Sequence, residues 1–262
     1  MSNLKTPAAP LVVAVDVTTR GVSIARITAP LLEAADKPLS AFVPQPADEG
    51  LAHTAYSTWH RATDLVKRSY AKITLNDERP TLVLFAKPIW GDLKTDPSAF
   101  RRHQIVALLQ DRLHKDRVPV GEFPLPTLLK WMTGSGVAGK GRGVMAALNK
   151  AVVDQWGTPS ASHSATAEGT PYNTQFRQST VALAAAAAMA VGLETQIPVV
   201  QSRLNYLSGY ETESAITRAN KSVMFPTRRK PPRTVEAWRE LNAHPETLLR
   251  VVDKDNAEED AA

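Results

Sequence analysis

The stretch from Leu11 to Ile27 constrains the fold more than any other part of the chain. Leu11 to Val15 is an unbroken apolar run, and such a run suits a strand that is covered on both faces. Asp16 ends the run, a polar turn follows, and Val22 to Ile27 leads away as a second strand. The stretch therefore predicts a buried β-hairpin around which the remaining elements assemble.

Asp16 is the chemically informative residue of this hairpin. A carboxylate at the end of a buried strand costs free energy unless it is paired, hydrogen-bonded or bound to a metal ion. The simpler interpretation is a turn aspartate that accepts backbone N–H bonds, and the stretch alone favours it. Asp16 is thus a candidate site residue that needs support from elsewhere in the chain.

Strands and helices alternate after the hairpin. Apolar residues at helical spacing predict helices over 52–73 and 97–114, with Trp59 and Phe100 on their inner sides. Arg101 and Arg102 stand in a first helical turn, where cations oppose the helix dipole, although a solvated basic face is the commoner explanation. The order is typical of an α/β fold. We expect neighbouring strands at 11–17, 81–85 and 118–122, with the helices over 52–73 and 178–193 packed against their sheet.

Composition excludes several classes of protein. The 262 residues contain no cysteine, so disulfides, thiolate zinc sites and cysteine nucleophiles are excluded. The six histidines have no metal-ligand spacing. No apolar run fits a membrane span, and the start MSNLKTPAAP lacks the core of a signal peptide, so we expect a cytoplasmic protein without membrane contact. The net charge of +5 permits a polyanionic partner.

A glycine-rich basic loop is the most distinctive segment. Glycines at five positions from 134 to 143 are interleaved with Lys140 and Arg142, between a short helical turn ending at Lys130 and a helix over 144–156. Glycine lets a backbone approach phosphate closely, and a following helix N-terminus attracts anions. The loop does not match the P-loop pattern. Phosphate contact and a flexible connection remain equally open at this point.

Four segments resemble RuvC-like Holliday-junction resolvases of the RNase H-like superfamily, particularly phage and actinobacterial forms. They are VAVDVTTRGVSIARI, ERPTLVLFAKP, VPVGEFPLPTLLKWMTGSGVAGKGRGVMAAL and STVALAAAAAMAVG, which span about residues 11–192 in the family's order. The resemblance implies an RNase H-like mixed sheet flanked by helices, a surface that binds DNA and, in active members, a divalent-metal endonuclease. It also implies, by analogy, a homodimer.

The sequence departs from the family at the acids that bind the catalytic metal ions. The family uses about four acids to hold two divalent ions at the scissile phosphate. Asp16 matches the first, but Phe85 and Ala86 stand where the second is expected, and the stretch that opens the last helix has no acid. Glu168 lies nearby in the loop 158–171, and Asp92 or Glu122 would have to supply a relocated ligand. One carboxylate cannot hold two dications.

The chain changes character after residue 195. We expect a domain over 1–195, an extension over 196–250 with a basic Pro-rich linker and a short helix, and an acidic disordered tail over 251–262. Arg228, Arg229 and Lys230 in the linker are candidate phosphate contacts, although a solvated linker is the slightly favoured explanation.

Two functional hypotheses follow. The first is a protein that binds branched or duplex DNA with a degenerate nuclease site and no cofactor, or that serves a structural or partner-binding role. The second is an active junction endonuclease with a rearranged site that uses Mg²⁺ or Mn²⁺. An actin-like ATPase also begins with a strand, an Asp and a Thr-rich turn, but it needs a longer chain. The candidate metal-binding and catalytic residue is Asp16, and the candidate DNA contacts are Arg20, Lys130, Thr133, Gly134, Lys140, Arg142, Arg228, Arg229 and Lys230.

Overall fold

The structure is a computed structural model. It describes residues 4, 5, 7, 9–46, 54–87, 98–134, 142–159, 161–163, 176–209, 223–226 and 229–246. The side chains of Leu75, Arg142, Ser162 and His163 lie outside this description.

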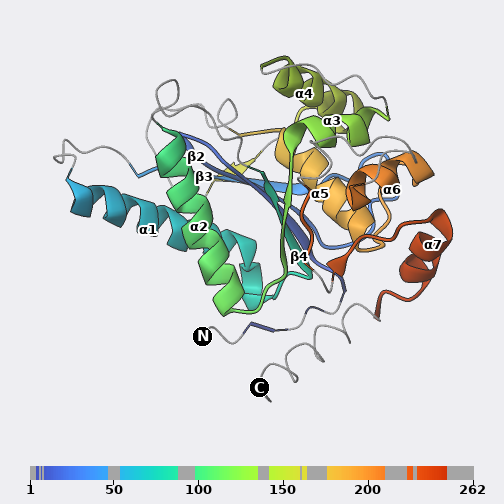
Figure 1. Cartoon of the computed structure of the whole chain (residues 1–262), viewed down its shortest axis with the longest axis horizontal. Helices are drawn as coiled ribbons and strands as arrows, with labels where there is room; N and C mark the ends of the chain where they lie inside the picture. Colours follow the sequence, from blue (N-terminus) through green and yellow to red (C-terminus); the bar gives the residue numbers. More distant parts are fainter. Residues whose placement is uncertain are drawn as a thin grey trace.

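A mixed sheet forms the centre of the molecule (Figure 1). Within the described residues it has six strands in the order β5-β4-β1-β2-β3-β6. The first three strands are antiparallel to their sequence neighbours, whereas β4 runs parallel to β1, β5 parallel to β4, and β6 parallel to β3. The strand bounds are β1 Val12–Val17, β2 Gly21–Ile27, β3 Leu39–Pro44, β4 Leu82–Ala86, β5 Val120–Phe123 and β6 Ser162–His163.

Helices cover both faces of this sheet (Figure 1). One face carries α1 (Ala55–Ile73), which leads into the short 3-10 helix η1 (Leu75–Asp77), and α2 (Ala99–Lys115). The other face carries α5 (Ser179–Ala190), which contacts β1, β2 and β4. The helices around α5 and beyond it are α3 (Leu125–Thr133), α4 (Arg142–Trp156), α6 (Gln201–Ser208) and α7 (Val235–Ala243). The predicted α/β fold, a mixed sheet flanked by helices, is confirmed.

The hairpin β1–β2 belongs to two apolar cores because strand side chains alternate between faces. Val13 and Val15 pack in the core beneath α1 and α2, while Val12 and Ala14 pack in the core beneath α5. The alanines at 184–188 are all fully buried, and their small side chains let α5 lie close to the sheet. The apolar run from Leu11 to Val15 is therefore covered on both faces, as predicted.

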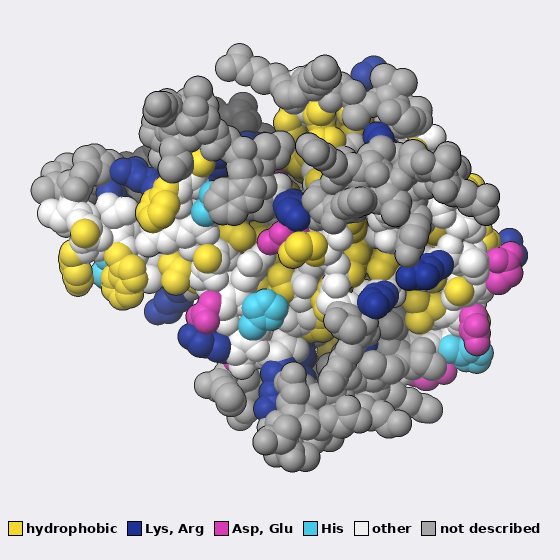
Figure 2. Space-filling view, in the orientation of Figure 1, with side chains coloured by type: hydrophobic (Ala, Val, Ile, Leu, Met, Phe, Trp, Pro, Cys, Tyr) yellow, Lys and Arg dark blue, Asp and Glu magenta, His cyan; other side chains and the backbone are white. Residues whose placement is uncertain are grey.

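Two aromatic residues expected in the core are exposed instead. Trp59 is 51% exposed and Phe100 is 69% exposed. The buried positions of α1 are Ala62, Leu65, Ser69 and Ile73, so only its second half lies on the sheet. The first half projects beyond it, where apolar side chains gather at the left of the molecule (Figures 1 and 2). The first turn of α2 likewise leaves Phe100 outside the core.

The C-terminal region packs onto the sheet and α5. Met224 exchanges backbone hydrogen bonds of 2.8 and 2.9 Å with Glu122, so this segment covers the outer edge of β5. Trp238 on α7 is buried and donates its indole N–H to the carbonyl oxygen of Met189 at 2.9 Å. The division at residue 195 stays a prediction. None of the described helices is long and apolar enough to cross a membrane.

Candidate nucleic-acid interface around Asp16

The turn between β1 and β2 is tightly specified. The backbone N–H and the hydroxyl of Thr18 both donate to the carbonyl of Gly21, at 2.8 and 3.0 Å. Gly21 has φ +152°, and a Cβ there would lie 2.2 Å from the carbonyl oxygen of Val43. Only glycine fits this position. The turn leaves Arg20 exposed at its tip, while Asp16 lies inside.

Asp16 faces α5 and is paired with protein groups. Strand alternation puts it on the same face as Val12 and Ala14, and it is only 6% exposed. The Ser179 hydroxyl donates to Asp16 Oδ2 at 3.3 Å, and Arg177 Nε lies 3.8 Å from the same oxygen. A serine and an arginine at the start of the closing helix thus occupy the place where the sequence resemblance implies two more acids.

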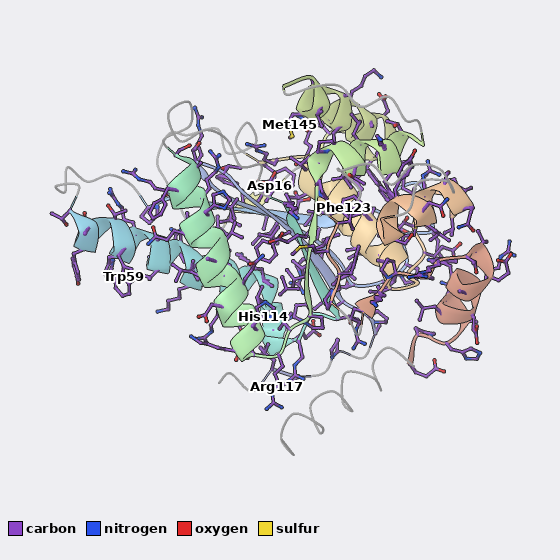
Figure 3. The ribbon with its side chains drawn as sticks, in the orientation of Figure 1. Asp16, Trp59, His114, Arg117, Phe123 and Met145 are labelled. Atoms are coloured by element: carbon purple, nitrogen blue, oxygen red, sulfur yellow. The ribbon has the colours of Figure 1, made fainter. Side chains whose placement is uncertain are left out.

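Arg177 is itself held in place. Its backbone N–H donates to Ser23 Oγ at 2.8 Å, and Ser23 is the register partner of Asp16 on β2. Its Nη1 donates to the sulfur of Met145 at 3.8 Å. Met145 belongs to the first turn of α4, and Figure 3 shows it beside the Asp16 end of the sheet. The first turn of the helix that follows the glycine-rich loop therefore contacts Arg177, the charge partner of Asp16.

Burial and charge act against each other on the Asp16 carboxyl. Burial raises its pKa, because the charged form loses water. The nearby guanidinium of Arg177, the hydrogen bond from Ser179 and the more distant charge of Arg102 lower the pKa by less. The protein thus supplies only part of the compensation that this buried anion requires.

The other acids near the sheet do not join Asp16. Val15 is paired with Phe85, and Phe85 with Glu122, so Glu122 faces α1 and α2 rather than α5. There it accepts a hydrogen bond from Gln110 at 3.0 Å and lies 3.9 Å from Lys87 Nζ. The relocated ligand considered from sequence is therefore on the wrong face of the sheet. Asp92 and Glu168 lie outside the described residues.

The described residues do not fit the pair of divalent ions that the fold family implies. They include no group of three or more His, Cys, Asp or Glu side chains placed to hold a metal ion. Ala86, next to Phe85 on the strand beside β1, contributes a methyl group to the α5-side core. The charge partner of Asp16 is the guanidinium of Arg177, and no hydrolytic step follows from this donor set.

A basic pocket lies at the same end of the sheet, on the opposite face. Its volume is about 230 Å³, and it is enclosed by the hairpin turn and helices α1 and α2. Arg61 and Arg101 line it together with polar side chains, and none of its described lining residues is acidic. Guanidinium groups and hydroxyls are typical phosphate donors. The described lining residues are Thr19, Gln45, Pro46, Thr58, Arg61, Ala62, Arg101, Gln104 and Ile105.

The predicted DNA contacts are only partly brought together. Lys130 and Thr133 lie in the last turn of α3, and Gly134 ends that helix with φ +69°. Arg203 on α6 donates to the carbonyl of Trp131 at 2.9 Å and fixes the same end. Lys230 is exposed, whereas Arg229 is only 4% exposed. Lys140, Arg228 and the side chain of Arg142 lie outside the described residues.

Sequence reasoning did not name three cations of this region as site residues. Arg177 directly precedes the last helix, where the family resemblance implies acids, and a cation is not expected there. Arg61 was hidden within an amphipathic helix. Arg101 carried a usable signal, because a cation in a first helical turn opposes the dipole and asks for another explanation.

Comparisons with known proteins give structural neighbours only. No protein-family model matches the chain, and no curated protein matches it in sequence. The solved structures that match include Thermus thermophilus RuvC, with TM-score 0.41, 10% identity, and coverage of 66% of this chain and 91% of that chain. They also include T. thermophilus RuvC in complex with a Holliday-junction substrate, with TM-score 0.43, 11% identity and the same coverage.

Proposed function

We propose that this protein is a RuvC-like relative of the phage and actinobacterial type that binds branched DNA without cutting it. The observation that carries the proposal is the pairing of Asp16 with Arg177 and Ser179. The one acid that matches the resolvase pattern is buried and is paired with a cation and a hydroxyl donor of the chain itself. A guanidinium in this place favours retention of phosphate and disfavours the recruitment of a divalent cation.

Cations at the Asp16 end support the binding part of the proposal. Arg20 is exposed at the hairpin tip, Arg177 is 38% exposed, and Arg61 and Arg101 line the neighbouring pocket. Contacts of this kind supply affinity and orientation on DNA but read no bases. The protein is therefore expected to select a DNA shape, the four-way junction, over a sequence.

A binding and cleavage experiment tests both parts. Fluorescently labelled junction, duplex and single-stranded DNA are titrated with the protein, and each is then incubated with Mg²⁺ or Mn²⁺. We expect the junction to bind most tightly and to stay intact. Cleavage that Asp16→Asn abolishes establishes the alternative, an active endonuclease with a rearranged site. Failure to bind any DNA removes the proposal and leaves a structural or partner-binding role.

Salt dependence identifies the residues that contact phosphate. Each lost phosphate contact should lower the slope of log affinity against log salt by about one unit. We expect this for Arg101→Gln at the start of α2, and equally for Lys140→Ala and Arg142→Ala in the glycine-rich loop. Lys115→Gln is the matched control, because Lys115 is exposed at the other end of α2 and is paired with Asp111 at 2.7 Å. A variant that keeps the parental slope contacts no phosphate.

A further inference from the structure

A second cavity lies away from Asp16. It has a volume of about 530 Å³ and is bordered by β2, β3, the C-terminal end of α1 and the segment around Pro159. Arg26 on β2 pairs with Val13 and Leu39, so it stands near the start of β1, whereas Asp16 stands near its end. The two residues also face opposite sides of the sheet. The cavity is thus separate from the proposed DNA site.

Arg26 is a buried cation with too few partners. Its side chain is 93% buried, since 7% is exposed, and its Nε and Nη1 atoms have no hydrogen-bond partner among the described residues. Its charge partner, Glu78 Oε2, lies 3.9 Å from Nη2, which is beyond hydrogen-bond length. A buried guanidinium left in this state costs free energy, and an anion in the adjacent cavity would lower that cost.

The rest of the cavity combines positive charge with apolar walls. Lys37 and Lys72 line it beside Arg26, and no described lining residue is acidic. Ile24, Leu39 and Ala161 belong to the apolar part of the lining. Its volume lies within the range that binds small organic molecules. Three cations on a wall that is otherwise apolar except for Ser40 suit a ligand with one anionic head and one hydrocarbon body.

We propose that this cavity binds a small amphiphilic carboxylate. The carboxylate lies among Arg26, Lys37 and Lys72, and the hydrocarbon body lies against Ile24, Leu39 and Ala161. This inference is independent of the proposed DNA binding, because none of the residues invoked for DNA lines the cavity.

Isothermal titration calorimetry with three probes tests the proposal. Octanoate carries both parts of the ligand, 1-octanol carries only the hydrocarbon body, and inorganic phosphate carries only the charge. We expect one octanoate site per chain, with the other two probes at least about tenfold weaker, because a charge-assisted hydrogen bond and the apolar contact must act together. Equal binding of octanoate and octanol overturns the proposal, as does phosphate binding that equals octanoate binding.

Variants locate the octanoate site. Lys72→Gln should weaken octanoate binding by about three- to tenfold, and Lys67→Gln, an exposed lysine of the same helix that does not line the cavity, should leave it unchanged. Ala41→Leu adds volume to the lining and should block binding while the charges stay. Lys72 and Lys37 are chosen over Arg26 because they are less buried, so their glutamine variants should fold. Parental octanoate affinity in both Lys72→Gln and Lys37→Gln shows that the proposal is wrong.

Discussion

Asp16 and Arg26 are two buried charges on one hairpin, and their surroundings differ. Asp16 has a hydroxyl donor at 3.3 Å and a guanidinium at 3.8 Å, both from the start of α5. Arg26 has Glu78 at 3.9 Å, and its Nε and Nη1 donate to no group of the described residues. The chain thus gives Asp16 a hydrogen-bond donor and an opposite charge, although these offset the cost of burial only in part. No hydrogen bond from the described residues reaches Nε or Nη1 of Arg26. The first favours a nuclease site that has been silenced, and the second favours a ligand.

Gly21→Ala should disrupt the hairpin that positions both Asp16 and Arg26. A Cβ at this position meets the Val43 carbonyl, and the φ of +152° is strained for alanine, so we expect a loss of about 3 kcal/mol or more in unfolding free energy. Urea unfolding followed by tryptophan fluorescence measures it. Gly143→Ala on α4 is the control, because nothing lies within 4 Å of a Cβ there, and it should gain up to about 1 kcal/mol. Equal stabilities of the two variants would contradict the tight turn.

Arg177→Met should lower the free energy of unfolding, because the buried carboxylate of Asp16 loses its nearby cation. Removing the cation leaves Asp16 with the Ser179 hydrogen bond but without its nearby charge partner. We expect a loss of about 1–2 kcal/mol in unfolding free energy at pH 7, below the value for fully buried pairs because Arg177 is 38% exposed. The loss should shrink in acid, where Asp16 is protonated. Asp16→Asn in the same background should restore most of the stability at pH 7. If the loss of stability is the same at all pH values and is not restored by Asp16→Asn, Arg177 stabilises the protein through contacts other than Asp16.

Arg26→Met should behave in the opposite way. Replacing an undersatisfied buried cation by an apolar side chain of similar length should be neutral or stabilising by about 1 kcal/mol when no ligand is present. Glu78→Gln, which removes the charge partner but keeps the cation, should instead cost about 1 kcal/mol. Thermal unfolding of the two variants in buffer free of organic anions measures both. A large loss in Arg26→Met would mean that the guanidinium is satisfied within the chain.

The smallest expected effect is the pH dependence that Asp16 gives the parent protein. Its pKa is raised by burial above the ordinary value of 3.8, so the folded protein holds this proton more tightly than the unfolded chain. Its contribution to stability therefore falls as the pH rises from about 3.8 through the raised pKa, and is constant above it. Asp16→Asn should remove this component of the pH dependence, because an amide does not titrate. Identical stability–pH profiles for the parent and this variant would contradict the direction of the shift.

Local patterns predicted most of the elements, and tertiary packing moved their edges. The helix over 178–193 is α5 at Ser179–Ala190, and the short turn before the glycine-rich loop is a full helix, α3. The helix α6 was not predicted, because the moderately polar stretch after residue 201 has little apolar periodicity, yet Leu204 and Leu207 are buried beside α3 and α5. The exposure of Trp59 was missed because periodicity gives the direction of a stripe but not the length of sheet available to cover it.

The sequence by itself determined the buried hairpin, the α/β alternation and the shortage of acids around Asp16. These follow from side-chain polarity along the chain, which is a local property. Only the tertiary structure decided that Glu122 faces away from Asp16, that Arg177 is paired with Asp16, and that Arg26 is buried beside a cavity. Each of these depends on the register between strands and on which helix covers which face. Such relations join residues that are far apart in the sequence, and a shift of one residue in register would reverse every face.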